Sequence, residues 1–380
     1  MAQMRRRAMS RQQTDIPPHP SPFPQGEGRQ VKIIGAGLAG AACANAFVHA
    51  GYSVTVHEQS AAPAAGASGV PIALFAPSIS ADDAPHSRLL RRGVHLLLLE
   101  LRRLTDAGLL VEGVDWAMTG VLERCIRADK KLPNVWLEPH DPIGLQSRVS
   151  SKSITARSAQ QVLEIFHGAA GWVNPKRLIA AWLAHPSIEV KTEARVDDVA
   201  VLDSDVVVVA CGYQTPELLP RLTATLQPIR GQVEWGATPV RAELVDVLLT
   251  YPINGMGHFI RTPDAWVAGA TFQREETNVQ PRAKDVDKNF EKLAVLVPEL
   301  AKPELERLRE QSASWVGIRT AQKSRQPLVE RIAISTHPNG WVCTGLGARG
   351  VSLAALCAEQ LLAATQTCDP APLGVLPKTL

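Results

Sequence analysis

The stretch VKIIGAGLAG, residues 31–40, decides the predicted fold of this 380-residue chain. Its first four residues form an apolar run typical of a buried strand, and the glycines that follow have the spacing GxGxxG. In such a turn the first glycine allows a tight bend, the second lets backbone N–H groups approach a pyrophosphate, and the third lets the helix pack closely on the strand. We therefore predict a strand, a phosphate-binding turn and a helix that runs through residue 50.

A second predicted strand, residues 53–57, ends at Glu58, which lies 23 residues after Gly35. A carboxylate at the end of this strand is placed to bind both hydroxyls of a ribose. Strand, glycine turn, helix, strand and acid in this register predict a dinucleotide-binding half-sheet, and the alternative is a coincidental glycine turn. The predicted contacts to the ADP moiety are Gly35, Ala36, Gly37, Leu38, Ala39, Gly40, Glu58 and Gln59.

The far end of the chain repeats the pattern of strand, glycine turn and helix. Residues 341–344 are predicted as a strand, GLGARG follows at residues 345–350, and an apolar helix follows over residues 351–364. A helix start with free N–H groups and a positive dipole end forms a site for an anion or a carbonyl. Two such sites at opposite ends of the chain indicate FAD, with the flavin ring near the second. The predicted contacts there are Gly345, Gly347, Ala348, Gly350 and Val351.

Two segments between these ends complete the predicted cofactor site. Residues 205–209 are predicted as a buried parallel strand, and Ala210, Cys211 and Gly212 follow as a small-residue turn at the edge of the cofactor. Residues 189–199 alternate between apolar and polar well enough to predict another strand. Its backbone near Val196 is expected to contact the adenine. The cofactor is therefore expected between segments that lie far apart in the chain.

The composition is that of an ordinary soluble protein, with 45% hydrophobic and 20% charged residues. No apolar run approaches the roughly 20 residues that a membrane-spanning helix needs. The six cysteines form no CxxC pair, which argues against a zinc ribbon or a dithiol redox motif, and we predict no metal site. Without a recognisable secretory signal, a reducing cytoplasm is the expected compartment.

The formal charge of +3 comes from the first residues of the chain. Residues 1–29 hold five arginines against Asp15 and Glu27, and removing these from 40 basic and 37 acidic residues leaves 35 of each. The same segment is rich in proline and poor in apolar residues, so we predict a disordered extension. An upstream start codon and a basic tail that contacts RNA are the alternatives.

The segment Gly66, Ala67, Ser68 and Gly69, followed by Pro71 and Pro77, resembles the FAD oxidoreductases of the D-amino acid oxidase superfamily, and most closely the MnmC-type tRNA wobble-uridine enzymes. The likeness runs over about residues 31–365. It departs at Val70, where the family usually has Asn beside the flavin, and at Ser324 and Glu330, which replace the usual Asp and Gly. The supporting segments are GWVNP at 171–175, PIRGQ at 228–232, GATFQR at 269–274, GIR at 317–319 with Pro327, and the GLGARG turn.

The expected fold class is α/β, with a Rossmann-like FAD-binding domain of the D-amino acid oxidase type and a second, mixed-sheet substrate domain. The FAD-binding domain is predicted from residues 30–85, 160–225 and 312–370, and the substrate domain from residues 86–159 and 226–311. We expect the substrate to enter between the sheet of the second domain and the flavin. The strands predicted in that domain are residues 117–124, 231–235, 258–262 and 265–271.

The resemblance implies FAD-dependent oxidation of the carboxymethylaminomethyl group on uridine 34 of tRNA, which releases glyoxylate and leaves an aminomethyl group. In bifunctional members this domain follows a methyltransferase. Nothing of that size precedes it here, so we expect an oxidoreductase that stands alone or works beside a separate methyltransferase. Two alternatives stay open: a small-molecule amine or amino-acid oxidase of the glycine, sarcosine or D-amino acid type, and a non-catalytic FAD-binding protein.

An arginine clamp for the carboxylate is the main demand of this chemistry, because FAD supplies the redox step and the protein orients the C–H bond. The resemblance places Arg319 on a strand that faces the flavin, although a surface arginine at a strand end fits the same pattern. Arg349, in the second glycine turn, is predicted to hold the carboxylate or the flavin. Tyr251 is a third candidate, with a core tyrosine as its alternative. No cysteine lies near the GIR segment, so FAD is expected to bind non-covalently.

The stretch HSRLLRRGVHLLLLELRRL, residues 86–104, is predicted as one amphipathic helix. At about 100° per residue its basic side chains share roughly one third of the circumference, opposite a leucine-rich face. We predict that this stripe contacts tRNA, and a solvated charged face is the alternative. Its members are Arg88, Arg91, Arg92, His95, Arg102 and Arg103, and Lys130, Lys131, Lys152 and Arg157 would extend it if they lie beside it.

Overall fold

A computed structural model describes residues 28–78, 80, 82–125, 147–152, 162–238, 251–334 and 337–367. The extension predicted at residues 1–29 therefore lies almost wholly outside the described residues. Lys130, Lys131 and Arg157 also lie outside them, and the side chain of Lys152 is not described.

A six-stranded sheet carries the first glycine turn, with the strand order β17-β18-β10-β1-β2-β9. All neighbours are parallel except β17, which is antiparallel to β18. The second predicted strand has the observed bounds of β2. The strands are β1 (Gln30–Ile34), β2 (Ser53–His57), β9 (Ile188–Lys191), β10 (Val206–Val209), β17 (Leu328–Ile334) and β18 (His337–Thr344).

Alternate residues of these strands enter two different cores, as the period of a strand requires. In β10, Val206 and Val208 belong to the core on the helical face, whereas Val207 and Val209 belong to the core on the other face. Both faces of the sheet are therefore covered, which explains why β10 is a continuous run of valines.

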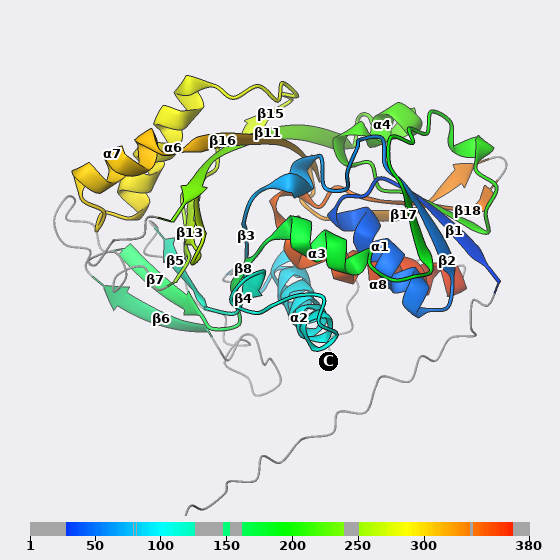
Figure 1. Ribbon diagram of the computed structural model, residues 1–380, viewed down its shortest axis with the longest axis horizontal. Coiled ribbons are helices and arrows are strands. Elements are labelled where there is room, and N and C mark those ends of the chain that lie inside the picture. Colours follow the sequence, from blue (N-terminus) through cyan, green and yellow to red (C-terminus); the bar gives the residue numbers. More distant parts are fainter. Residues whose placement is uncertain are drawn as a thin grey trace, which may run out of the picture.

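Four helices share the first of these cores and lie on one face of the sheet (Figure 1). Helix α2 packs against α8, and Gly93 allows the close approach, because a Cβ there would lie 2.2 Å from the main-chain oxygen of Ser352. The helices are α1 (Leu38–His49), α2 (Pro85–Asp106), α3 (Pro175–Trp182) and α8 (Gly350–Thr367).

A nine-stranded sheet forms the second half, with the order β15-β11-β14-β13-β12-β5-β7-β6 and with β16 paired to β11. The long strands β11 and β16 extend from the half that carries helices α6 and α7 toward the half that carries α4 (Figure 1). The strands are β5 (Val121–Cys125), β6 (Ser147–Lys152), β7 (Val162–His167), β11 (Leu226–Ala237), β12 (Ile253–Asn254), β13 (His258–Arg261), β14 (Ala265–Gly269), β15 (Gln273–Arg274) and β16 (Ala313–Gln322).

Smaller elements complete the two halves. A three-stranded sheet, β3-β8-β4, lies beside them, and its Trp172 shares an apolar cluster with Val233 and Ile260 of the large sheet. Helices α6 and α7 cover the outer face of the large sheet through a core that contains Trp266 and Phe290. The remaining elements are β3 (Ala73–Phe75), β4 (Trp116–Ala117), β8 (Gly171–Val173), α4 (Thr215–Leu218), α6 (Ala283–Leu296) and α7 (Lys302–Glu310).

The predicted α/β fold class with a second mixed sheet is confirmed, and the observed layers differ from the predicted segment boundaries at three elements. Helix α2 packs in the core of the six-stranded half, because its apolar face meets α8. Strands β7 and β16, predicted with the cofactor half, pair within the nine-stranded sheet.

Two predicted strands are shorter than expected. The strand predicted over residues 189–199 ends at Lys191, where Glu193 adopts a positive φ of 52° and the chain bends to follow the end of β2. The strand predicted over residues 117–124 is divided into β4 and β5 at Gly120, whose φ is 82°. None of the helices in the described part of the chain combines the length and the apolar character that crossing a bilayer requires.

Candidate active site

A cavity of about 680 Å³ lies where the end of the parallel sheet meets strands β11, β13 and β16 of the large sheet. Both glycine turns border it, and so do the segment after β2 and the turn after β10. The predicted cofactor contacts that line it are Gly35, Gly37, Leu38, Ala39, Glu58, Gln59, Gly66, Ala67, Ser68, Val196, Ala210, Cys211, Gly212, Gly345, Gly347, Ala348, Gly350 and Val351.

The first glycine turn has the geometry that its sequence predicts. Gly35 adopts a φ of 102°, and a Cβ on Gly40 would lie 1.9 Å from the main-chain oxygen of Gly35. The hydroxyl of Ser68 accepts a hydrogen bond from the amide of Leu38 at 3.0 Å, which brings the GASG segment to the start of α1. Only glycine fits at both turn positions, because any side chain would displace the backbone.

Three of the predicted cofactor contacts shape the turn without lining the cavity. Ala36 donates its amide to the carboxylate of Glu58, and Gly40 packs on Gly35. Gly69 donates its amide to the main-chain oxygen of Gly66 at 2.9 Å, and a Cβ on Gly69 would lie 2.5 Å from an oxygen of Ala64.

Glu58 is a buried carboxylate, 8% exposed, at the point where a ribose is predicted. Its Oε2 accepts the amide of Ala36 at 2.9 Å and its Oε1 accepts the amide of Ser60 at 2.9 Å. Two backbone donors therefore set the position of a carboxylate that still lines the cavity. Beside it, the side chain of Gln59 donates to Gln214 Oε1 at 2.6 Å.

The second glycine turn closes the opposite end of the cavity. Gly345 and Gly347 adopt φ values of 74° and 58°, and a short 3-10 turn over Gly347–Arg349 leads directly into α8. Thr344 donates its hydroxyl to the main-chain oxygen of Gly212 at 3.3 Å, which joins this turn to the turn after β10. Two helix starts, those of α1 and α8, therefore border one cavity.

Arg319 points into this cavity from β16, opposite Ile229 of β11. Its Nη2 donates to the main-chain oxygen of Thr271 at 2.9 Å, and its Cζ lies 5.4 Å from the ring centroid of Phe272. A Cβ on Gly231 would lie 2.0 Å from this Nη2, so the glycine leaves room for the guanidinium. Burial lowers the pKa of Arg319 to about 10, and the side chain stays charged at neutral pH.

Arg349 lines the same cavity from the second glycine turn. Burial lowers the pKa of its guanidinium, and the charge of Glu123 opposes that shift. The structure therefore brings the two predicted arginines to one cavity.

His258 of β13 also lines the cavity, and the sequence reasoning missed it. Burial, followed by the charges of Arg319, Arg349 and Lys292, lowers its pKa to about 4, so the imidazole is neutral at pH 7. Its place next to Gly257 was the available signal, because a glycine-rich turn that precedes a short strand often borders a site.

Tyr251 is not among the residues that line the cavity. It is 41% exposed, and its ring packs edge-on against Phe166 with a centroid distance of 4.9 Å. The predicted site role of Tyr251 therefore has no geometric support.

Residues 30–364 match the family described as FAD dependent oxidoreductase, known as DAO. This match covers most of the chain. The protein belongs to this family of FAD-dependent oxidoreductases.

Curated relatives carry the name tRNA 5-methylaminomethyl-2-thiouridine biosynthesis bifunctional protein MnmC. The protein from Polaromonas sp. is 37% identical over 90% of this chain and 57% of its own length. The protein from Verminephrobacter eiseniae is 35% identical over 90% of this chain and 61% of its own length. The chain thus spans about three fifths of the curated relatives it matches.

Solved structures of DAO-type proteins share the fold at low sequence identity. Glycine oxidase from Bacillus cereus matches with a TM-score of 0.70 and 18% identity, over 90% of this chain and 96% of the other. Iminodiacetate oxidase from Chelativorans sp. matches with a TM-score of 0.67 and 18% identity, over the same shares. These likenesses extend across both halves of the chain.

The residues present fit an FAD molecule. Two buried polar atoms of cavity-lining residues, the hydroxyl of Thr320 and Nε2 of His57, have no hydrogen-bond partner among the described residues. Such orphaned groups are costly unless a ligand or water satisfies them. Together with the two helix starts and Glu58, they provide sites for a pyrophosphate, a ribose and polar ring atoms. The family's cofactor therefore suits this cavity.

The basic stripe predicted on α2 is divided in the structure. Arg91 is buried and ion-paired with Asp83, and Arg103 pairs with Glu100 at 2.9 Å and also contacts Asn45. Arg88 and Arg102 stay exposed, and Arg92 is half-buried. Arg91 therefore does not belong to an exposed stripe, because helical spacing does not show which arginines find acidic partners elsewhere in the fold. Contact of the remaining arginines with tRNA stays a prediction.

Proposed function

We propose that this protein oxidises the carbon next to a secondary amine and removes the carboxymethyl group from carboxymethylaminomethyl-uridine 34 of tRNA. The observation that carries the proposal is the pair Arg319 and Arg349, two guanidinium groups that line one cavity bordered by the FAD-type glycine turns. The names of the curated relatives support a modified tRNA nucleoside as the substrate, and membership of the DAO family supports an oxidation as the reaction.

The arginine pair binds and orients the carboxylate of the substrate. A guanidinium grips a carboxylate through two parallel hydrogen bonds, and the interaction is stronger where water is excluded. Neutral His258 adds no further positive charge beside an amine that must lose electrons. These residues therefore hold the acid end and leave the adjacent C–H bond available for oxidation.

The reaction balances without a catalytic acid or base from the protein. Bound FAD supplies the two-electron oxidant. The substrate carbon loses one hydrogen and two electrons, the amine loses its proton to solvent, and the C=N bond forms. Water adds to that bond and the C–N bond breaks, which gives glyoxylate and the aminomethyl-uridine. The role of the protein is to hold the acid group and to keep the substrate in one orientation.

The bound FAD is proposed to be non-covalent. Cys211 is the one cysteine among the described residues that line the cavity. Burial raises the pKa of its thiol to about 12, and the thiol donates to the main-chain oxygen of Ile34 at 3.4 Å. A protonated thiol held in this way is a poor nucleophile for a flavin.

The proposed partner is tRNA, in the cytoplasm, and a methyltransferase is proposed to act on the same nucleoside. The exposed Arg88 and Arg102 of α2, with half-buried Arg92, are proposed to contact the RNA backbone. The neutral charge of the chain beyond residue 29 leaves such local contacts as the source of RNA affinity.

The nucleosides of a deletion strain test the proposal. Mass spectrometry should show carboxymethylaminomethyl-uridine accumulating at the wobble position, and the purified protein should be yellow and release its flavin in acid. A colourless protein that does not take up FAD would remove the cofactor claim. An unchanged nucleoside profile would remove the tRNA claim.

A small N-substituted glycine is the second candidate substrate, because the arginine pair would hold its carboxylate equally well. Turnover of free glycine or N-methylglycine by the purified protein, together with an unchanged nucleoside profile, would favour this alternative.

A further inference from the structure

The loop from Thr271 to Arg282 borders the cavity and is hydrogen-bonded to β11 as it leaves β14. Thr271 donates its amide to Gln232 O at 3.0 Å and accepts the amide of Gln232 on its hydroxyl at 3.0 Å. Further along, Glu275 donates its amide to Pro228 O at 2.9 Å. The first half of the loop thus runs as an added edge of the sheet, through β15.

Arg230 of β11 holds the loop in position. Its side chain is fully buried, and each of its five N–H groups has an acceptor. The acceptors are Asn278 O (2.7 Å), Gln280 O (2.7 Å), Gln273 Oε1 (2.8 Å), Asp285 Oδ2 (2.5 Å) and Gln232 Oε1 (3.1 Å). Two of them are main-chain oxygens of the loop, so Arg230 sets its backbone path.

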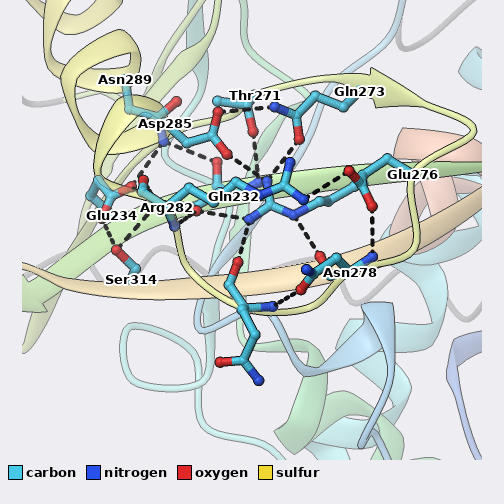
Figure 2. Close-up of polar contacts among 12 residues, drawn as sticks. Gln232, Glu234, Thr271, Gln273, Glu276, Asn278, Arg282, Asp285, Asn289 and Ser314 are labelled. Atoms are coloured by element: carbon cyan, nitrogen blue, oxygen red, sulfur yellow. Dashed lines mark hydrogen bonds and ion pairs between the residues drawn. The ribbon is translucent and has the colours of Figure 1, made fainter.

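Other polar contacts join the same network, and Figure 2 shows them converging from β11, the loop and α6. Asn289 donates to Gln232 O at 3.0 Å and to Glu234 Oε1 at 3.0 Å. Arg282 donates to Glu276 Oε2 at 2.8 Å and closes the loop. A loop with this many buried contacts is preorganised, and it presents its side chains in one arrangement.

Phe272 and Val279 are the apolar side chains that this rigid loop presents at the cavity. Phe272 is 53% exposed and Val279 is 52% exposed, and both line the cavity. The guanidinium of Arg319 lies over one face of the Phe272 ring, and the side chain of Phe272 is still more than half exposed. A large apolar ring that is exposed at the wall of a cavity is typical of a ligand contact.

We propose that Phe272 packs against the uracil ring of the substrate, and that it thereby selects a nucleoside over a free N-substituted glycine. This inference rests on the proposed function. Proteins that act on a single base take it out of the stack and hold it against aromatic or apolar side chains. Phe272 provides such a surface, and Arg230 is the positioning residue that fixes it.

The length of the substrate agrees with this placement. Four bonds separate the carboxylate carbon from C5 of the uracil ring, a reach of roughly 5 Å when extended. The Cζ of Arg319 lies 5.4 Å from the centre of the Phe272 ring. Arg319 and Phe272 are thus close enough for one short molecule to contact both.

Steady-state kinetics of the FAD-loaded enzyme test the proposal, with tRNA that carries carboxymethylaminomethyl-uridine as substrate. Phe272→Ala should raise KM roughly 10- to 100-fold, the range expected when one base–aromatic stacking interaction is removed. The kcat of this variant should stay within about threefold of the wild-type value, because the residues that hold the acid group are unchanged. Phe272→Tyr, which keeps the ring, should retain the wild-type KM. Val295→Ala is the matched control, since Val295 is 63% exposed on α6 and does not line the cavity.

Each outcome either supports or overturns the proposed role of Phe272. An unchanged KM in Phe272→Ala would overturn the proposal. An equal rise in KM for N-methylglycine would overturn it too, because Phe272 would then act through Arg319 on the acid group and not on the base. Flavin content and thermal midpoint should match the wild type, as the side chain is half exposed. A wild-type enzyme that does not convert this tRNA at all would refute the proposed function itself, a result distinct from failure of the Phe272 variants alone.

Discussion

The carboxylate of Glu58 accepts a hydrogen bond from the amide of Ala36 at 2.9 Å, across the first glycine turn. This contact ties the end of β2 to the turn that begins α1, and it holds the acid at the wall of the cavity. The predicted ribose site and the predicted pyrophosphate site are thus parts of one hydrogen-bonded unit.

Glu58→Ala should weaken FAD binding. The variant removes the acceptor for the ribose hydroxyls and leaves the amides of Ala36 and Ser60 without their partner. Because hydrogen bonds to a charged group contribute about 1.5–3 kcal/mol, the dissociation constant should rise roughly 10- to 100-fold. Titration of the apoprotein by flavin fluorescence measures it. Glu189→Ala, a carboxylate 62% exposed on β9, is the control, and equal affinity of the two variants would contradict the role of Glu58.

Arg319→Lys should reduce kcat/KM for the proposed substrate by about 100-fold or more, mainly through KM. A lysine keeps a positive charge but lacks the paired donors and the hydrogen bond to Thr271 O. Michaelis–Menten kinetics with the modified tRNA provide the measurement. Arg221→Lys, on an exposed turn, should behave as the wild type. Retained activity in Arg319→Lys would show that the carboxylate is held elsewhere.

His258 should make the protein less stable in mild acid. Its folded pKa of about 4 lies below the ordinary value of 6.5, so the unfolded chain binds more protons between these values. Stability from this group is present above pH 6.5 and is lost as the pH falls toward 4, by up to roughly 3 kcal/mol.

His258→Asn provides the comparison for this pH effect. The variant cannot gain the proton, so its thermal midpoint should fall less between pH 7 and pH 4.5 than that of the wild type. Burial also lowers the pKa values of His57 and His86, but the wild type and His258→Asn share that contribution to the pH dependence. Parallel curves for the two proteins would refute the assignment.

The double variant Arg88→Ala/Arg102→Ala should bind tRNA more weakly. Each arginine that no longer pairs with a phosphate should reduce the slope of log affinity against log salt by about one. Filter binding at several salt concentrations measures the slope, and Arg307→Ala, exposed on α7, is the control. If the double variant keeps the wild-type slope, this face of α2 is ordinary solvated surface. Arg91 is unsuitable for the test, because it is buried in its ion pair with Asp83, whereas Arg88 contacts Asp83 from an exposed position.

The elements that the sequence predicted well are those whose signals are local. The glycine spacing at residues 35–40, the strand at 53–57 and the helix that follows Gly350 depend on backbone conformations that only neighbouring residues decide. Glycine has to stand where a Cβ would meet backbone, and that requirement is visible in the chain itself. The α/β class followed from the same signals.

Tertiary structure decided which side chains meet. Phe272 and Arg319 are 47 positions apart. The sequence assigned no role to His258 or to Arg230, although Arg230 lies in the supporting segment at residues 228–232. The arginines of α2 looked equivalent on a helical projection, but Arg88 and Arg91 pair with Asp83, Arg103 pairs with Glu100, and only Arg91 is buried. Glycine turns, strands and helices depend on the preferences of a few consecutive residues. Burial, ion pairing and the composition of a cavity depend on contacts between distant segments, which form only when the chain has folded.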